Sequence, residues 1–200
     1  MDQTKKLQQQ FPNSAALYNI RGATYAGLRQ FDAAVESYRY AIRLKPNYPD
    51  AYNNLGEAQR NTGNLDSAIE SYSYAIRLKP DYAEAYNNLG IAQRNTGNLD
   101  SAIENHSYAT NLRPDYAEAY NNLGCSQQQK GNLGAAMDSY RQAIKLKPDY
   151  AEAYNNLGTA WNYNGNLEVA LESYRYAIKL KPDYAEAYKN VGVSQQQSGD

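Results

Sequence analysis

The sequence predicts an all-α fold in which helical hairpins stack into a solenoid, and three observations predict it. First, six prolines from Pro12 to Pro182 and six glycines from Gly22 to Gly192 recur every 34 residues, a period typical of stacked repeats. Second, each period holds two stretches whose apolar residues follow helical spacing. Third, the apolar residues are mainly Ala and 21 Tyr, and small residues let helices approach while large ones fill the gaps.

The chain begins and ends on partial repeats. Pro12 stands in the register of Pro46, so residues 1–14 correspond to the last turns of a second helix. Residues 185–200 supply a first helix without its second. We expect either that a longer array has been cut at both ends or that these segments are capping helices, because terminal repeats need a polar outer face.

Five full repeats of two helices each lie between these ends. In the second of them, Ala68, Tyr72 and Ala75 share one face of the second helix. The predicted repeats are residues 15–48, 49–82, 83–116, 117–150 and 151–184.

Glycine, asparagine and proline mark the expected helix ends. In the second repeat, Gly63 is expected to end the first helix and Asn64 to cap the second. Pro80 ends that second helix, because proline cannot continue the helical hydrogen bonds. Asp81 with Glu84 three residues later forms a pattern like a capping box for the next helix.

These residues resemble the tetratricopeptide repeat family in type and spacing. The resemblance covers nearly the whole chain and implies a right-handed α-solenoid whose first helices line a concave surface. Three positions depart from the pattern: Arg21 replaces a leucine, His106 replaces an aromatic residue, and Gly134 lies at the start of a second helix. The matching residues of the second repeat are Tyr52, Leu55, Gly56, Ala68, Tyr72, Ala75 and Pro80.

Composition argues against several classes of function. The chain carries 20 basic and 21 acidic side chains, a net charge of −1, whereas nucleic acids and anionic membranes are bound through a surplus of basic charge. No apolar run could span a membrane and no signal-peptide core is present, so we expect a cytoplasmic protein. The one histidine, His106, falls at a core position, and the one cysteine, Cys125, lacks a basic partner in the sequence. We therefore expect no enzymatic activity, no cofactor and no metal.

The predicted binding surface is a groove lined by the first helices. With each repeat counted so that its leucine is position 7, positions 2, 5, 6, 9, 12 and 13 are expected on one helical face. Positions 5 and 6 are almost all asparagine, and position 12 adds two arginines that are candidate anchors for an acidic ligand side chain. The candidate groove residues are Asn53, Asn54, Asn87, Asn88, Asn121, Asn122, Asn155, Asn156, Asn190, Arg60 and Arg94.

The asparagines suggest what this groove binds. Asn is a poor helix former, so ten of them at positions 5 and 6 sacrifice about 6 kcal/mol of helix propensity, and replacing position 6 with Ala is expected to preserve or raise stability. A carboxamide can donate and accept, which suits the backbone of an extended peptide. The row is similar to the asparagine ladder in the repeat domain of the O-linked N-acetylglucosamine transferase, which implies extended protein segments as ligands. The alternative is that the amides are solvated or bond to a neighbouring repeat.

The leading hypothesis is a protein-protein interaction scaffold that binds an extended peptide. A clamp for a C-terminal carboxylate is disfavoured, because an acidic row would repel it. Two alternatives remain open: a substrate-recruiting arm of a larger glycosyltransferase or sulfotransferase, and a structural scaffold that self-associates through its terminal helices. The acidic row at position 2 is Asp50, Glu84, Glu118, Glu152 and Glu186.

Overall fold

A computed structural model of the 200-residue chain describes residues 13–198. These residues form eleven helices joined by short turns, with no strand among them, so the all-α prediction is confirmed. Most of the partial repeat predicted at residues 1–14 lies outside the described residues, as do residues 199–200.

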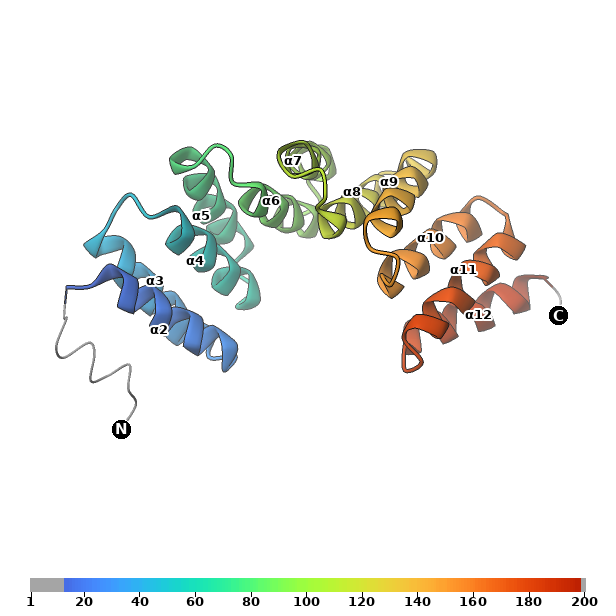
Figure 1. Cartoon of the computed structure of the whole chain (residues 1–200), viewed down its shortest axis with the longest axis horizontal. Coiled ribbons are helices and arrows are strands. Elements are labelled where there is room, and N and C mark those ends of the chain that lie inside the picture. Colours follow the sequence, from blue (N-terminus) through green and yellow to red (C-terminus); the bar gives the residue numbers. More distant parts are fainter. Residues whose placement is uncertain (1–12, 199–200) are drawn as a thin grey trace. The chain divides into compact units, whose positions relative to one another are not determined.

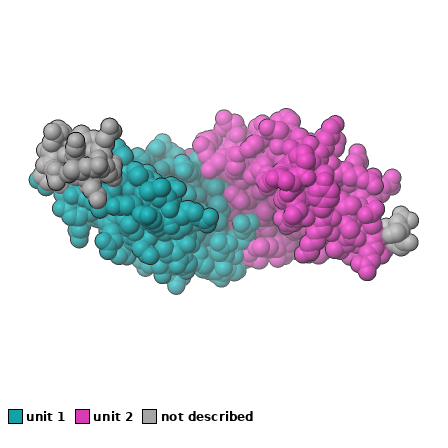
Figure 2. All heavy atoms as spheres, turned by 90° about the horizontal axis from the view of Figure 1, so that it is seen from below, with its two compact units in different colours: residues 1–98 teal, residues 99–200 magenta. Residues whose placement is uncertain are grey.

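The helices fall into two compact units, residues 1–98 and residues 99–200, which are coloured separately in Figure 2. Figure 1 labels the helices α2 to α12. The first unit holds α2 (Ala15–Gly27), α3 (Phe31–Leu44), α4 (Pro49–Asn61), α5 (Leu65–Leu78) and α6 (Ala83–Asn95). The second holds α7 (Leu99–Leu112), α8 (Ala117–Gln129), α9 (Leu133–Leu146), α10 (Ala151–Tyr163), α11 (Leu167–Leu180) and α12 (Ala185–Ser198).

Each unit is built from helices that pack on the next helix in the chain (Figure 1). In the first unit the first helices also contact one another, α2 with α4 and α4 with α6, and in the second unit α8 contacts α10 and α10 contacts α12. Within either unit, no such contact joins two second helices among the described residues. The first helices are therefore the inner layer of each unit.

A left-handed residue closes the turn inside each repeat. Gly63 has a φ of 81° and follows the end of α4, as the sequence predicts. Arg29 occupies the same register in the first repeat with a φ of 58°, a conformation that costs energy for any residue with a Cβ. The other three glycines of this kind are Gly97, Gly131 and Gly165.

Of the two predicted caps, the first is at the expected residue without a side-chain bond, and the second is wrong. Asn64 stands at the N-cap of α5, but its side chain makes no cap bond and instead donates Nδ2 to Oγ1 of Thr62 at 2.9 Å. The N-cap of α6 is Tyr82 rather than Asp81, and the Tyr82 side chain makes no cap bond. The Lys79 ammonium lies 4.7 Å from the centre of the Tyr82 ring, so a cation–π contact occupies the turn where we expected a capping box.

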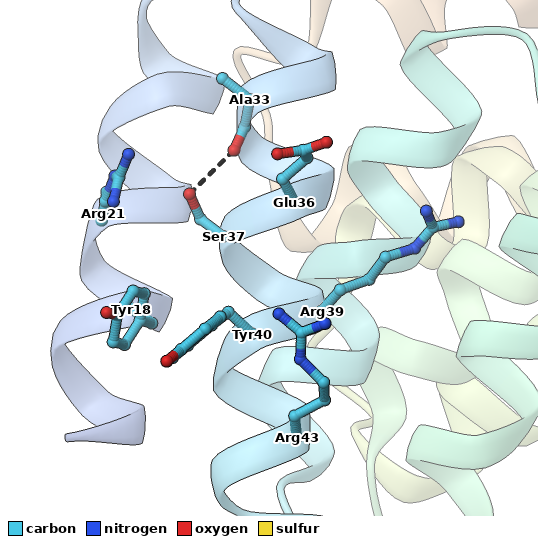
Figure 3. A pocket seen from close by; sticks show the side chains of 8 residues that line it. All are labelled: Tyr18, Arg21, Ala33, Glu36, Ser37, Arg39, Tyr40 and Arg43. Atoms are coloured by element: carbon cyan, nitrogen blue, oxygen red, sulfur yellow. Dashed lines mark hydrogen bonds between the residues drawn. The ribbon is translucent and has the colours of Figure 1, made fainter. Parts of the chain in front are cut away.

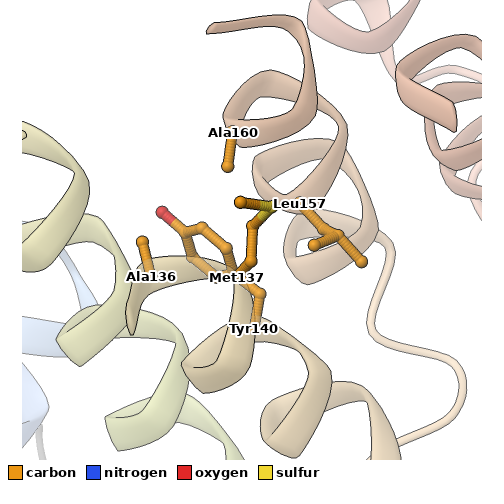
Figure 4. Close-up of a cluster of buried hydrophobic side chains, with 5 residues drawn as sticks. All are labelled: Ala136, Met137, Tyr140, Leu157 and Ala160. Carbon is orange, nitrogen blue, oxygen red and sulfur yellow. The ribbon is translucent and has the colours of Figure 1, made fainter. Parts of the chain in front are cut away.

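The core forms where a second helix meets the first helix of the next repeat. In Figure 4, Leu157 of α10 packs against Met137 and Tyr140 of α9. The tyrosine of the second helix in turn lies on a glycine of the first helix: a Cβ built on Gly124 would be 2.6 Å from Cε1 of Tyr140. Large tyrosines and small glycines therefore interlock, as the composition indicates.

The departures from the repeat pattern leave the fold intact. His106 is fully buried in α7, as expected for a core histidine. Arg21 is half-buried, and its Nη2 donates to the Tyr25 hydroxyl at 3.3 Å. Nothing lies within 4 Å of a Cβ built on Gly134, so no close contact requires glycine there.

Candidate functional site

The asparagines at position 6 run along the inner layer and are half-buried. We call Asn54, Asn88, Asn122, Asn156 and Asn190 the position-6 row. In each unit, the Nδ2 of a position-6 asparagine donates to the Oδ1 of the asparagine at position 5 in the preceding repeat. The bonds are Asn54 to Asn19 at 3.2 Å, Asn88 to Asn53 at 3.1 Å, Asn156 to Asn121 at 3.0 Å and Asn190 to Asn155 at 2.9 Å.

The asparagines at position 5 lie beneath that row. We call Asn19, Asn53, Asn87, Asn121 and Asn155 the position-5 row, and its last four members are between 1% and 7% exposed. The sequence pattern predicts both rows on the groove face. Within each unit, Asn19, Asn53, Asn121 and Asn155 instead accept bonds from the next first helix. The alternative in which the amides bond to a neighbouring repeat therefore describes this contact.

The position-6 row keeps hydrogen-bonding capacity for a ligand. A carboxamide offers two N–H donors and an oxygen with two lone pairs. The bond to the position-5 row uses one N–H of Asn54, so its second N–H and its oxygen are left on the inner layer. Asn156 makes one further contact, with Sγ of Cys125 at 3.5 Å. Hydrogen bonds to the position-5 row thus hold the amide groups of Asn54 and Asn156 in a fixed orientation.

The two candidate arginines of the groove are half-buried. Burial raises the pKa of the Tyr72 hydroxyl to about 12, and the neighbouring Arg60 acts in the opposite direction. The Arg60 charge therefore acts on Tyr72, a core residue that packs against Leu89 and Ala92 of the next repeat. Arg94 lies in the last turn of α6.

Two acids at position 2 are paired with lysines. Lys147 Nζ lies 3.3 Å from Glu118 Oε1, and Lys181 Nζ lies 3.4 Å from Glu152 Oε1. These exposed pairs reduce the negative charge that the sequence alone assigns to that end of the first helices.

A hollow of about 330 Å³ opens between α2 and α4, beside Asn54. Sequence reasoning missed it, although a signal was present: the first repeat has Ala23, Ala26 and Gly27 at the groove positions 9, 12 and 13, where later repeats have larger side chains. The lining residues are Ala23, Ala26, Gly27, Phe31, Tyr38, Asn54, Glu57, Ala58 and Asn61.

A second hollow, of about 360 Å³, lies on the other side of the first repeat, between α2 and α3. Figure 3 shows Tyr18 and Tyr40 facing each other, with ring centres 4.1 Å apart. The Arg39 side chain points away from Tyr18 and Arg21, so the basic groups do not converge on one point (Figure 3). This hollow is separate from the asparagine rows.

Neither a membrane-crossing helix nor a metal-ligand cluster is found in residues 13–198. No helix there is long and apolar enough to cross a bilayer. No group of three His, Cys, Asp or Glu side chains in the same stretch is arranged to hold a metal ion.

Family models of repeat proteins match most of the chain. A model described as tetratricopeptide repeat matches residues 21–83 and 61–109. A model described as TPR repeat matches residues 94–131, 128–161 and 162–199. A search of curated proteins found no match to the chain.

Several solved structures share the fold. The crystal structure of MamA protein is 27% identical, with a TM-score of 0.73 over 86% of this chain and 94% of that one. YrrB, described as a TPR protein with an unusual peptide-binding site, is 21% identical, with a TM-score of 0.72 over 94% of this chain and 97% of that one. TTC0263, a thermophilic TPR protein from Thermus thermophilus, is 23% identical, with a TM-score of 0.73 over 92% and 100%. The predicted fold class, an α-solenoid of helix-turn-helix repeats, is confirmed.

Proposed function

Because the chain belongs to the tetratricopeptide repeat family, whose members generally mediate protein–protein interactions, we propose that it is a scaffold that binds an extended segment of a partner protein. The observation that carries the proposal is in the position-6 row: Asn54 and Asn88 are held by hydrogen bonds to Asn19 and Asn53, and each keeps a second N–H and its oxygen on the inner layer. YrrB, which shares the fold, is described as having a peptide-binding site.

The spacing of the row suits an extended backbone. Within a unit, neighbouring first helices pack about 10 Å apart and an extended chain rises about 3.3 Å per residue, so successive asparagines of one unit meet about every third residue of the segment. An amide that donates and accepts can bond to backbone N–H and C=O groups whatever the side chains are. Because hydrogen bonds to the position-5 row already hold Asn54, Asn88, Asn156 and Asn190, little side-chain entropy is lost on binding.

This assigns different roles to the two rows. The position-6 row, with Arg60 and Arg94 farther along the first helices, contacts the segment. The buried position-5 row orients the position-6 row and does not touch the ligand. Because the row bonds to backbone groups, it does not select the amino-acid sequence of the segment. Selection comes only from side-chain subsites that adjoin the row.

The test compares two fourfold variants against peptides selected by the wild-type protein from a random 12-residue display library. Asn54, Asn88, Asn122 and Asn156 are changed to Ala in one variant. The matched control changes Asn64, Asn98, Asn132 and Asn166, which are exposed at the turns between helices, to Ala. Fluorescence anisotropy should show binding at least about tenfold weaker for the first variant, because several hydrogen bonds are lost, and unchanged binding for the control.

The groove variant also removes bonds between repeats, so its fold is checked separately. Circular dichroism at the assay temperature must show full helical content, and single Asn→Ala changes supply folded intermediates if the fourfold variant is unstable. Full-strength peptide binding by a folded groove variant would refute the role of the row.

A further inference from the structure

The geometry points to a subsite for a lysine or arginine side chain of the bound segment, in the hollow between α2 and α4. This inference rests on the proposed function, since the hollow adjoins Asn54 of the position-6 row. The backbone amides of the segment would bond to the row, and one long basic side chain would enter the hollow. Main-chain bonds would then supply affinity and the hollow would supply specificity.

The shape of the hollow suits one long side chain. Its floor is made by the buried side chains of Tyr38 and Ala58, and its walls by the half-buried Ala26 and Phe31. Its volume of about 330 Å³ is at the lower end of ligand sites in proteins. An apolar stem can therefore lie against alanine and aromatic carbon, as the stems of lysine and arginine do when their charged ends stay near water.

The charge of the lining selects a cation. Glu57 is the one ionisable carboxylate among the lining residues, it is exposed at the rim, and it forms no ion pair with the residues that the structure describes. The oxygen of Asn54 is a second acceptor at the same rim. Phe31 and Tyr38 add aromatic rings to the lining, and aromatic rings favour a nearby cation. An acidic ligand side chain would instead meet the Glu57 carboxylate.

Neighbouring charges leave this preference in place. The next charged residue of α4 is Arg60, one turn on; it does not line the hollow, and both Arg60 and Glu57 act on the Tyr72 hydroxyl. Burial raises the pKa of Tyr38 to about 12, with Glu57 as a smaller contributor, so the Tyr38 hydroxyl stays neutral at physiological pH. The floor is therefore uncharged and the rim negative.

The hollow also sets the register of the segment. It exists where Ala23, Ala26 and Gly27 leave space. The second repeat has Glu57, Arg60 and Asn61 at these positions, and the third has Ile91, Arg94 and Asn95. A basic residue fixed at the first two repeats would decide which residue of an otherwise unselected segment faces Asn88 in the same unit.

The first experiment tests the hollow without any peptide. Isotope-labelled protein is titrated with n-butylammonium, n-butyrate and butan-1-ol, and the methyl signals of Ala23, Ala26 and Ala58 are followed by NMR. We expect n-butylammonium to shift these signals and n-butyrate to leave them unchanged. Glu57→Gln should abolish the difference, whereas Glu70→Gln, the same change on an exposed residue of α5, should preserve it. Equal shifts with butyrate, or an unaltered response in Glu57→Gln, would overturn the subsite.

The second experiment uses peptides that differ at one residue. A peptide from the library is made with Lys, norleucine or Glu at the position expected to enter the hollow. Lys should bind about three- to fivefold more tightly than norleucine, the gain of one exposed ion pair, and more tightly still than Glu. Ala23→Trp fills the hollow from an exposed position and should remove the preference.

The two proposals fail differently. If all three peptides bind equally and the four-asparagine variant loses all of them, the scaffold function stands and the basic subsite is excluded. If the n-butylammonium response is present but no selected peptide depends on the position-6 row, the hollow is a cation site and the proposed function is excluded.

Discussion

At the scale of single residues, the turn inside each repeat depends on one backbone conformation. Four repeats use glycine with a positive φ there, and the first uses Arg29 with a φ of 58°. A residue with a Cβ adopts this region at a cost of about 1–2 kcal/mol. The first repeat therefore carries strain that the others lack.

We predict that Arg29→Gly stabilises the protein by about 1 kcal/mol, because the relief of strain exceeds the extra entropy that glycine gives the unfolded chain. The midpoint of urea unfolding should rise. The reciprocal change Gly63→Arg introduces the same strain in the second repeat and should lower the midpoint. A lower midpoint for Arg29→Gly would contradict the assignment of strain.

A second residue-scale prediction concerns the glycines that receive tyrosine rings. Gly124→Ala places a Cβ 2.6 Å from Cε1 of Tyr140 and should destabilise the protein by about 1–3 kcal/mol. Gly192→Ala is the matched control, since it has the same register in α12 and nothing within 4 Å of its Cβ. That variant should be neutral or more stable, because Ala favours helix over Gly by about 1 kcal/mol. Thermal melting of both variants tests this prediction, and equal losses of stability would contradict it.

At the scale of the helices, neighbouring first helices are joined by carboxamide pairs. Asn88 donates to the buried Asn53 across α6 and α4. The sequence alone suggests that removing a poor helix former such as Asn88 should preserve or raise stability. The structure reverses this expectation, because the Asn53 oxygen would lose its donor in the interior.

We therefore predict that Asn88→Ala destabilises the protein by about 1–3 kcal/mol, the cost of a buried unsatisfied group. Asn53→Ala with Asn88→Ala should cost less than the sum of the two single changes, with a coupling of about 0.5 kcal/mol or more. Urea unfolding of the four proteins gives this coupling. Strict additivity would show that the pair contributes nothing.

At the scale of the whole molecule, buried tyrosines recur along the chain and link its stability to pH. Burial raises the pKa of Tyr38, Tyr72 and Tyr184 to about 12, whereas an unperturbed tyrosine titrates at about 10. Tyrosine becomes charged when it loses its proton, so the unfolded chain ionises first. Stability is fully present below about pH 10 and is lost as pH rises toward about 12.

We predict a steep alkaline transition over that range. Helical content, followed by circular dichroism, should fall over that range, because ionisation of the buried hydroxyls favours the unfolded chain. Tyr72→Phe removes one of them and should make the pH dependence of the urea midpoint shallower. A urea midpoint that stays constant from about pH 10 to about pH 12 would contradict the prediction.

Short-range features of the sequence were sufficient for much of this structure. The 34-residue period, the helical spacing of Ala68 and Tyr72, and Gly63 at the turn predict helices and their ends, because each depends on residues within a few positions of one another. The start of α6 was missed, because the contact of Lys79 with the Tyr82 ring replaces the expected Asp81 cap.

The sequence by itself determined the repeat, the all-α fold and the position of asparagine on the first helices. Only the tertiary structure decided that Asn53 is buried while Asn54 stays half-buried on the inner layer, and that a hollow opens beside Glu57. The reason is physical: helical spacing fixes the direction of a side chain from its own axis, but what covers it depends on how closely the neighbouring helix packs.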